Sequence, residues 1–284
     1  MNFFPYYNAL DQMYHSEWCL KKLTRQERFR QLFDSLWPSG HPTRLIQVVG
    51  THGKGSVCTY LEAGFQTQTT AGVFSNPHLF DFRERFRIQG SSVLPEEIVE
   101  LWEKKLQPLF VKLHLKDAAF VPYFSEVCLL LALFLFEEHE LEWGILETGS
   151  GGRYELLSVL PVEAVVMTSL GYDHPHKLGE KQWQRTLEKG GAMRPQQPFF
   201  SVEPSQESAQ IIHSLAHHLK TPVYWLTSQE QETLQERIKH HSFPPEALLQ
   251  GHHQRINAAL GAKVIHYFYP EISLDALIQS WKPV

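Results

Sequence analysis

The sequence has few cysteines, no excess of basic charge and no apolar run long enough to cross a membrane. Its three cysteines, Cys19, Cys58 and Cys128, are far apart and form no C-x-x-C pair. This spacing argues against a disulfide framework and a cysteine-rich zinc site, and it favours a reducing, cytoplasmic environment. With 31 acidic and 26 basic residues the net charge is −5, so no nucleic-acid partner is indicated.

The longest apolar run covers residues 127–136, about half the length that a bilayer requires. We therefore expect a buried helix there and no membrane partner. The opening residues lack a basic start followed by an apolar stretch, so no secretory signal is predicted. At 284 residues and 43% hydrophobic content, the chain can bury a large core as one domain or as one domain with an appendage.

Residues 45–56, "LIQVVGTHGKGS", have the order of a phosphate-binding loop. A short apolar strand is followed by glycines that permit a sharp turn, and Lys54 and Ser56 then begin a helix whose free amide groups favour an anion. Lys54 is suited to the outer phosphates and Ser56 to the accompanying magnesium. The spacing departs from the strict Walker pattern, so the residues alone leave open a glycine-rich turn with a solvated lysine.

Apolar strand-like runs alternate with helical stretches along the chain, which is typical of an α/β fold with a doubly wound, mostly parallel sheet. The region 228–249 is the least regular, and "HHSFPP" within it is predicted to be a loop. We expect strands at residues 45–49, 71–74, 143–147, 164–168, 198–202 and 223–226, and helices at residues 54–66, 95–111, 123–138, 182–189 and 205–219.

Polar residues follow the strands at the edge where ligands bind in such sheets. Glu147 closes an apolar strand, where a carboxylate is costly unless a cation or a hydrogen-bond donor meets it, so we expect magnesium between Ser56 and Glu147. His174 follows the next strand, either as a further metal ligand or as a surface or capping histidine. Arg153 is either a phosphate clamp or a salt-bridge partner.

Seven blocks occur in an order that resembles the ATP-binding portion of folylpolyglutamate synthases, within the wider Mur ligase family. They cover residues 45–262, and "LTRQERFRQLFDSL" at residues 23–36 resembles the helical start of that family. The family's own loop reads Gly-Thr-Asn-Gly-Lys-Gly-Ser/Thr, so the variant spacing is expected, with His52 in place of asparagine. The blocks are "VVGTHGKGS", "FSNPHLFDFRERFRIQG", "PYFSEVCLLLALFLF", "ILETGSGGR", "MTSLGYDH", "LEKGGAMRP" and "GHHQRINAALGA".

The resemblance implies an ATP-dependent amide ligase that activates a folate carboxylate as an acyl phosphate, which the amine of glutamate then attacks. It implies catalytic roles for Lys54, Glu147, His174 and Lys189, with magnesium on Ser56, Glu147 and His174. Lys189 matches the position of a lysine that relatives often carry as a carbamate, which is a negatively charged metal ligand. The alternative is an unmodified, solvated lysine. The loop at 75–85 would approach the folate, with Tyr123 and Phe124 near its pterin. The implied ATP contacts are Gly50, Thr51, Gly53, Lys54, Gly55, Ser56, Val57, Arg153, Gln254 and Asn257.

Several departures from the family pattern support an alternative function. Asn76 replaces the family's usual serine, and residues 154–158 have lost an aspartate, a threonine and an asparagine. We expect residues 1–284 to form the Mur-ligase-like ATP-binding domain, with residues 1–44 as a helical lead-in and the family's C-terminal ligase domain absent. The alternatives are a degenerate nucleotide- or folate-binding module, and a Mur-type ligase with a different carboxylate substrate. Either a monomer or a homodimer that completes the site is compatible with these residues.

Overall fold

The computed structural model describes residues 25–118, 120–240 and 251–281, which build helices around one eight-stranded sheet. The strand order is β4-β3-β2-β5-β1-β6-β7-β8. The strands from β2 to β8 in this order are parallel, whereas β3 and β4 pair antiparallel at one edge. The strands are β1 (Arg44–Val49), β2 (Ala71–Phe74), β3 (Phe86–Ile88), β4 (Ser91–Ser92), β5 (Trp143–Glu147), β6 (Ala164–Met167), β7 (Phe199–Val202) and β8 (Val223–Leu226).

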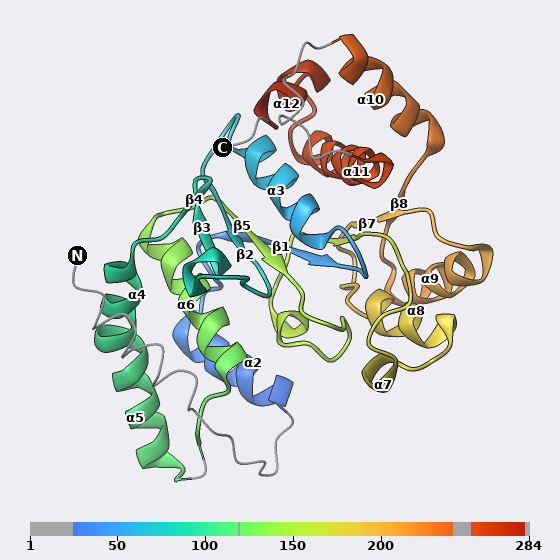
Figure 1. Cartoon of the computed structure of the whole chain (residues 1–284). Coiled ribbons are helices and arrows are strands. Elements are labelled where there is room, and N and C mark those ends of the chain that lie inside the picture. The colour runs from blue at the N-terminus through green and yellow to red at the C-terminus, as the bar shows by residue number, and fades with distance from the viewer. Residues whose placement is uncertain (1–24, 119, 241–250, 282–284) are drawn as a thin grey trace.

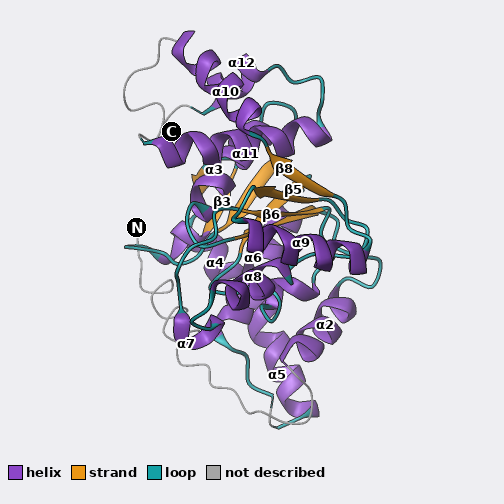
Figure 2. Ribbon diagram, turned by 90° about the vertical axis from the view of Figure 1, so that its right-hand side faces the viewer, coloured by secondary structure: helices purple, strands orange, loops and turns teal. Residues whose placement is uncertain are grey.

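Helices cover both faces of the sheet, as a doubly wound fold requires (Figures 1 and 2). One face carries α3 (Lys54–Phe65), α10 (Ser228–His240), α11 (His252–Phe268) and α12 (Leu274–Ser280). The remaining helices lie on the other face or beside it. They are α2 (Arg25–Leu36), α4 (Pro95–Leu101), α5 (Gln107–Lys116), α6 (Phe124–Glu138), α7 (Pro175–Leu178), α8 (Gln182–Gly190) and α9 (Gln206–Leu219), with η1 (Phe82–Arg85), the π-helical η2 (Trp102–Leu106) and η3 (Leu156–Val159).

The fold class and the six parallel strands predicted from the sequence are confirmed, with strand ends that differ by one residue at most. Within the predicted lead-in at residues 1–44, α2 occupies Arg25–Leu36, and residues 1–24 lie outside the described residues. The prediction of irregular structure from residue 228 is wrong for residues 228–240, which form α10. Most of the "HHSFPP" loop lies outside the described residues.

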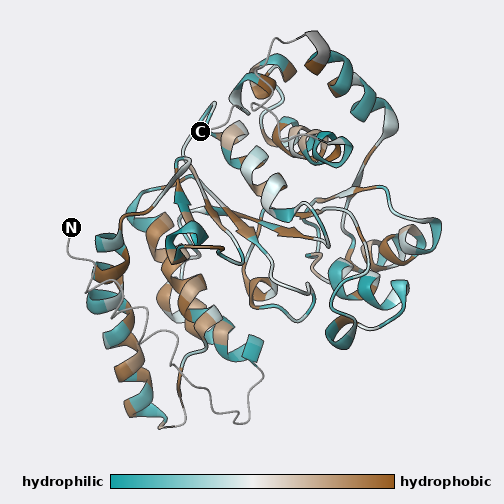
Figure 3. Ribbon diagram, in the orientation of Figure 1, coloured by the Kyte–Doolittle hydropathy of each residue, from teal (hydrophilic) through white to brown (hydrophobic). Residues whose placement is uncertain are grey.

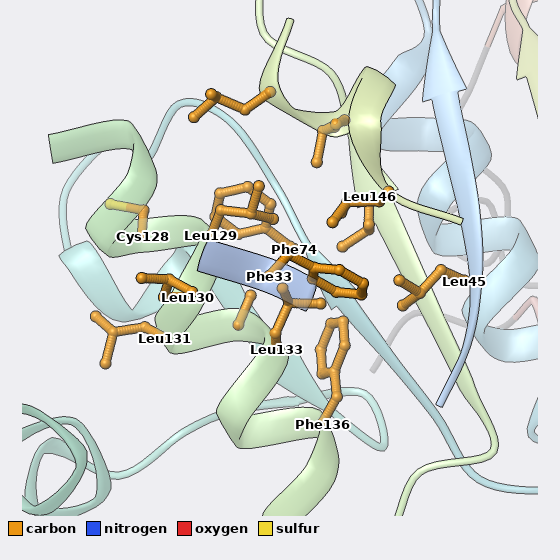
Figure 4. Packing of buried hydrophobic residues seen from close by; sticks show 14 of the residues in the cluster. Phe33, Leu45, Phe74, Cys128, Leu129, Leu130, Leu131, Leu133, Phe136 and Leu146 are labelled. Carbon is orange, nitrogen blue, oxygen red and sulfur yellow. The ribbon is translucent and has the colours of Figure 1, made fainter. Parts of the chain in front are cut away.

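The core under one face of the sheet centres on α6, which is apolar around most of its circumference (Figures 3 and 4). Leu130, Leu131 and Leu133 have no exposed surface. Side chains of β1 alternate, with Leu45 packing toward α6 and Ile46 toward α3 and α11. The buried helix predicted at residues 127–136 is confirmed, and no described helix is long and apolar enough to span a membrane.

A buried carboxylate ties α6 to α2. Glu126 is 1% exposed and lies 3.3 Å from Arg28 and 3.8 Å from Arg25. Burial raises the pKa of Glu126 to about 8, and the two arginines oppose this shift. The group therefore adds stability that is complete below its ordinary pKa of 4.5 and is lost as the pH rises toward 8.

Unfolding between pH 5 and pH 8 releases a proton from Glu126, because its pKa is lower in the unfolded chain. Glutamine has no such proton, so we expect Glu126→Gln to reduce the loss of stability over this pH range. The measurement is the free energy of unfolding in urea at both pH values. Glu138→Gln, at an exposed ion pair with Lys105, is the matched control and should keep the parent pH dependence. An unchanged pH dependence in Glu126→Gln would contradict the assignment.

Candidate functional site

The carboxyl ends of β1, β5 and β6 meet around the glycine loop at residues 50–53. Gly50 and Gly53 have φ values of 146° and 84°, which favour glycine. A Cβ atom at Gly50 would lie 1.9 Å from Oγ1 of Thr168, and one at Gly53 would lie 2.4 Å from Oδ1 of Asn257. The loop therefore needs glycine at both positions, for conformation and for space.

Lys54 begins α3 and folds back over this loop. Its Nζ donates to the backbone oxygens of Gly50 at 3.2 Å and Thr51 at 3.3 Å. The N-cap of α3, Gly53, supplies no side-chain hydrogen bond to the first turn. The ammonium group and the free first-turn amides together form a place for an anion.

Glu147 places a buried carboxylate beside the start of α3. It is 6% exposed, and its Oε2 accepts a hydrogen bond from the backbone amide of Asn76 at 3.2 Å. An added Cβ at Gly55, the residue before Ser56, would lie 3.6 Å from the same oxygen. Burial raises the pKa of Glu147, while the Asn76 amide and the Lys54 charge oppose this shift.

A magnesium ion fits this arrangement. Within the described ranges, no cationic side chain forms an ion pair with Glu147, and a buried carboxylate is costly without a positive partner. The described residues contain no group of three or more His, Cys, Asp and Glu side chains that could hold a metal. Magnesium usually completes its shell with waters and phosphate oxygens, so Ser56 and Glu147 suit it.

Lys189 reaches the loop from the end of α8. It is 1% exposed, and its Nζ lies 2.9 Å from Oδ2 of Asp173, 3.0 Å from the Gly50 oxygen and 3.3 Å from the Ser150 oxygen. Burial lowers the pKa of Lys189, and Asp173 opposes this shift. The alternative of a solvated lysine is therefore wrong, whereas the carbamate role stays a prediction.

Asp173 also holds the loop directly. Its second carboxylate oxygen, Oδ1, accepts a hydrogen bond from the Thr51 hydroxyl at 3.1 Å. Thr51 in turn accepts from the backbone amide of Gly171 at 3.0 Å. The loop after β1, the segment after β6 and the end of α8 are thus joined through one carboxylate.

The other predicted site residues lie on α11, at the start of α7 and in the segment after β5. Asn257 packs against Gly53 and donates to Gln254 at 3.2 Å, so α11 borders the glycine loop, and the ATP contacts of these two residues stay a prediction. His174 is exposed, has φ 41° and is the N-cap of α7, so its metal role stays a prediction. Arg153 is exposed with its guanidinium 5.1 Å from the Tyr154 ring centre. In the described part of the chain it makes no ion pair, so the salt-bridge alternative has no support.

Sequence reasoning missed two carboxylates that shape the turn after β5. Glu155 accepts from the backbone amides of Ser150 at 3.3 Å and Gly151 at 3.0 Å. Glu188 accepts from the amides of Gly152 and Tyr154, both at 3.3 Å. The sequence offered one indication of the role of Glu155. This residue stands where the folylpolyglutamate synthase pattern has aspartate, and both residues carry a carboxylate.

The fold and this loop define the class of protein, an α/β domain with a phosphate-binding loop at the carboxyl edge of a mostly parallel sheet. No protein-family model matches the sequence. The chain is 33% identical to human mitochondrial folylpolyglutamate synthase over 229 residues, which is 78% of this chain and 37% of the human protein. It is 29% identical to the dihydrofolate synthase/folylpolyglutamate synthase of Bacillus subtilis, over 82% of this chain and 57% of that protein.

By sequence, the chain is similar to the folylpolyglutamate synthases, and it spans about 37% of the length of the human enzyme. Solved structures agree on the fold. Folylpolyglutamate synthase from Thermotoga maritima superposes with a TM-score of 0.80 at 23% identity, covering 100% of this chain and 67% of that one. The Mycobacterium tuberculosis enzyme complexed with ADP gives 0.83 at 19% identity, covering 98% and 65%.

Proposed function

We propose that the chain is the ATP-binding part of an ATP-dependent ligase that joins glutamate to a folate carboxylate. The observation that carries this proposal is Glu147, a buried carboxylate without an ion-pair partner among the described residues, beside a phosphate-type loop. Homology to folylpolyglutamate synthases over 78% of the chain supports the substrate class. A relative crystallised as a complex with the ATP analogue AMPPCP supports the nucleotide.

The reaction brings together two anions, the substrate carboxylate and the γ-phosphate of ATP. Lys54 and the first amides of α3 would lower their repulsion as the carboxylate attacks and ADP leaves, giving an acyl phosphate. The amine of glutamate then attacks the acyl carbon, and phosphate leaves as the amide forms. Magnesium on Ser56 and Glu147, when bound, would neutralise phosphate charge.

The folate would be met by the loop at residues 75–85 and the start of α6. Leu79 and Phe80 are 80% and 96% exposed, so they offer an uncovered apolar tip to a ring system. Arg85 lies 5.4 Å from the ring centre of Phe124, which joins this loop to α6. The roles of these residues, of Tyr123 and of glutamate as second substrate are part of the proposal, as are a cytoplasmic location and a monomer or homodimer.

The test is ADP release from magnesium-ATP by the purified chain, with and without a reduced folate plus glutamate. We expect release that requires both substrates, with a product larger by one glutamate in mass spectrometry. Release without glutamate incorporation would contradict ligation. Magnesium-dependent ATP binding with no release would favour the degenerate binding module.

Glu147→Gln tests the metal assignment in the same assay. The amide keeps the size of the side chain but loses the negative charge. The magnesium concentration for half-maximal ADP release should therefore rise about tenfold or more, which corresponds to the loss of one charge-assisted contact. Glu138→Gln, exposed and paired with Lys105, is the control. Identical magnesium titrations for Glu147→Gln and the parent would rule out Glu147 as a ligand.

A further inference from the structure

The pairing of the strands brings both ends of the loop at residues 75–85 beside Glu147. β2 and β5 are parallel neighbours, so Asn76, two residues past the end of β2, meets Glu147, the last residue of β5. The antiparallel pairing of β2 with β3 returns the other end of the loop to the same place, where the Ser75 amide donates to the Arg85 carbonyl at 2.9 Å. Asn76 and Glu147 are therefore in contact although 71 positions separate them.

Asn76 holds Glu147 at two points. Its backbone amide donates to Oε2 of the carboxylate at 3.2 Å, and its side-chain Nδ2 donates to the Glu147 backbone oxygen at 3.1 Å. The other carboxylate oxygen, Oε1, accepts no hydrogen bond from a residue of the described ranges. The two bonds therefore fix the end of β5 and one carboxylate oxygen, and they leave the second oxygen for a cation.

Arg85 in turn fixes the side chain of Asn76. Its Nη1 donates to Oδ1 of Asn76, and its Nε donates to Nδ1 of His78 at 2.8 Å. The Asn76 carboxamide thus accepts on one side and donates on the other, which sets its orientation. Arg85 is 8% exposed, lies 5.4 Å from the ring centre of Phe124 and forms no ion pair among the described residues. Its side chain therefore serves the turn that carries Asn76.

We infer that Arg85 and Asn76 are positioning residues, which fix the Glu147 carboxylate in the orientation that binds magnesium. Carboxylates that ligate metals are themselves held by hydrogen bonds, and loss of such a partner typically costs about 10- to 100-fold in metal affinity or activity. The inference rests on the proposed function, because the magnesium role of Glu147 belongs to it. It adds the residues that set the geometry of this ligand.

The charge of Arg85 acts in the opposite direction to its positioning. A guanidinium group close to the site repels a magnesium ion, so removal of the charge alone would strengthen magnesium binding. Loss of the hydrogen bond to Asn76 would instead release the Glu147 carboxylate from its fixed orientation and weaken magnesium binding. The sign of the change therefore separates the two effects.

The experiment is calorimetric titration of the purified chain with AMPPCP at a series of magnesium concentrations and, separately, in EDTA. Arg85→Met removes the charge and the hydrogen-bond donors but keeps an apolar stem beside Phe124. We expect the magnesium concentration for half-maximal AMPPCP binding to rise about tenfold. The affinity in EDTA should stay the same, because the side-chain contacts of Arg85 lie in its own loop and on α6.

Three further variants sharpen the test. Asn76→Ala, at a half-buried position, should raise the magnesium requirement in the same way, and it replaces Arg85→Met if circular dichroism shows that Arg85→Met is unfolded. In a Glu147→Gln background, Arg85→Met should have no additional effect, because Arg85 acts through that carboxylate. Arg237→Met, at an exposed ion pair with Asp275, is the matched control and should keep the parent values.

A higher magnesium requirement that disappears in the Glu147→Gln background supports the inference. Unchanged or tighter magnesium binding in Arg85→Met and Asn76→Ala overturns it, and so does an equal loss of AMPPCP affinity with and without magnesium. In these cases the magnesium dependence of the parent chain still supports the proposed function. AMPPCP binding by the parent that does not respond to magnesium would instead overturn the magnesium role of Glu147 and this inference with it.

Discussion

Replacing Lys54 with alanine is expected to weaken binding of magnesium-ATP by about 10- to 100-fold, because hydrogen bonds to charged groups contribute about 1.5–3 kcal/mol. The fold should persist, since Lys54 begins a helix at the surface of the loop and its Nζ hydrogen-bonds two backbone oxygens among the described residues. The measurement is calorimetry with AMPPCP and magnesium, together with thermal unfolding of both proteins.

Lys104→Ala is the matched control, because Lys104 is an exposed helical lysine paired with Glu100. It should change neither the affinity nor the stability by a measurable amount. If Lys54→Ala keeps the parent affinity, the ammonium group is not part of the nucleotide site and the loop is only a turn between β1 and α3.

Removing the Asp173 carboxylate is expected to destabilise the protein by about 3 kcal/mol, because Asp173→Ala leaves the buried Lys189 ammonium without its counter-charge. The Thr51 hydroxyl also loses its acceptor. The measurement is the midpoint of urea unfolding. The loss should shrink at alkaline pH, since the lowered pKa of Lys189 lets it become neutral there.

Asp275→Ala removes one partner of a solvent-exposed ion pair with Arg237 and is the control. It should cost about 1 kcal/mol or less. Adding Lys189→Met to Asp173→Ala should recover part of the lost stability, because it removes the uncompensated charge. A similar small effect of Asp173→Ala and Asp275→Ala would contradict a buried, tightly held pair.

The parallel strands were predictable because each is a short apolar run bounded by turn residues, and burial on both faces produces that pattern. The β3–β4 hairpin was not predictable, since β4 has only two residues, Ser91 and Ser92, and both are exposed. Helix α10 was missed because it is mostly polar, and its fully buried Leu234 gives little periodic signal.

The candidate site was predictable where the chemistry is local. The glycines of the loop and Lys54 come soon after β1, and Glu147 ends β5, so sequence position places them at one edge of the sheet. The pairing of Lys189 with Asp173 and the approach of Asn257 to Gly53 depend on how separate helices pack, and no local pattern encodes that.

The Gly50 carbonyl accepts hydrogen bonds from both Lys54 and Lys189, and the second of these residues lies 139 positions further along the chain. Contacts between such distant residues form late, after a long loop has closed. The glycine loop is translated early, yet its surroundings are completed only when β6, α8 and α11 have been made and docked. On the proposed function, nucleotide binding during synthesis on the ribosome would begin only after most of the sheet has assembled. ATP would then be a ligand for the finished domain and not for its early folding intermediates.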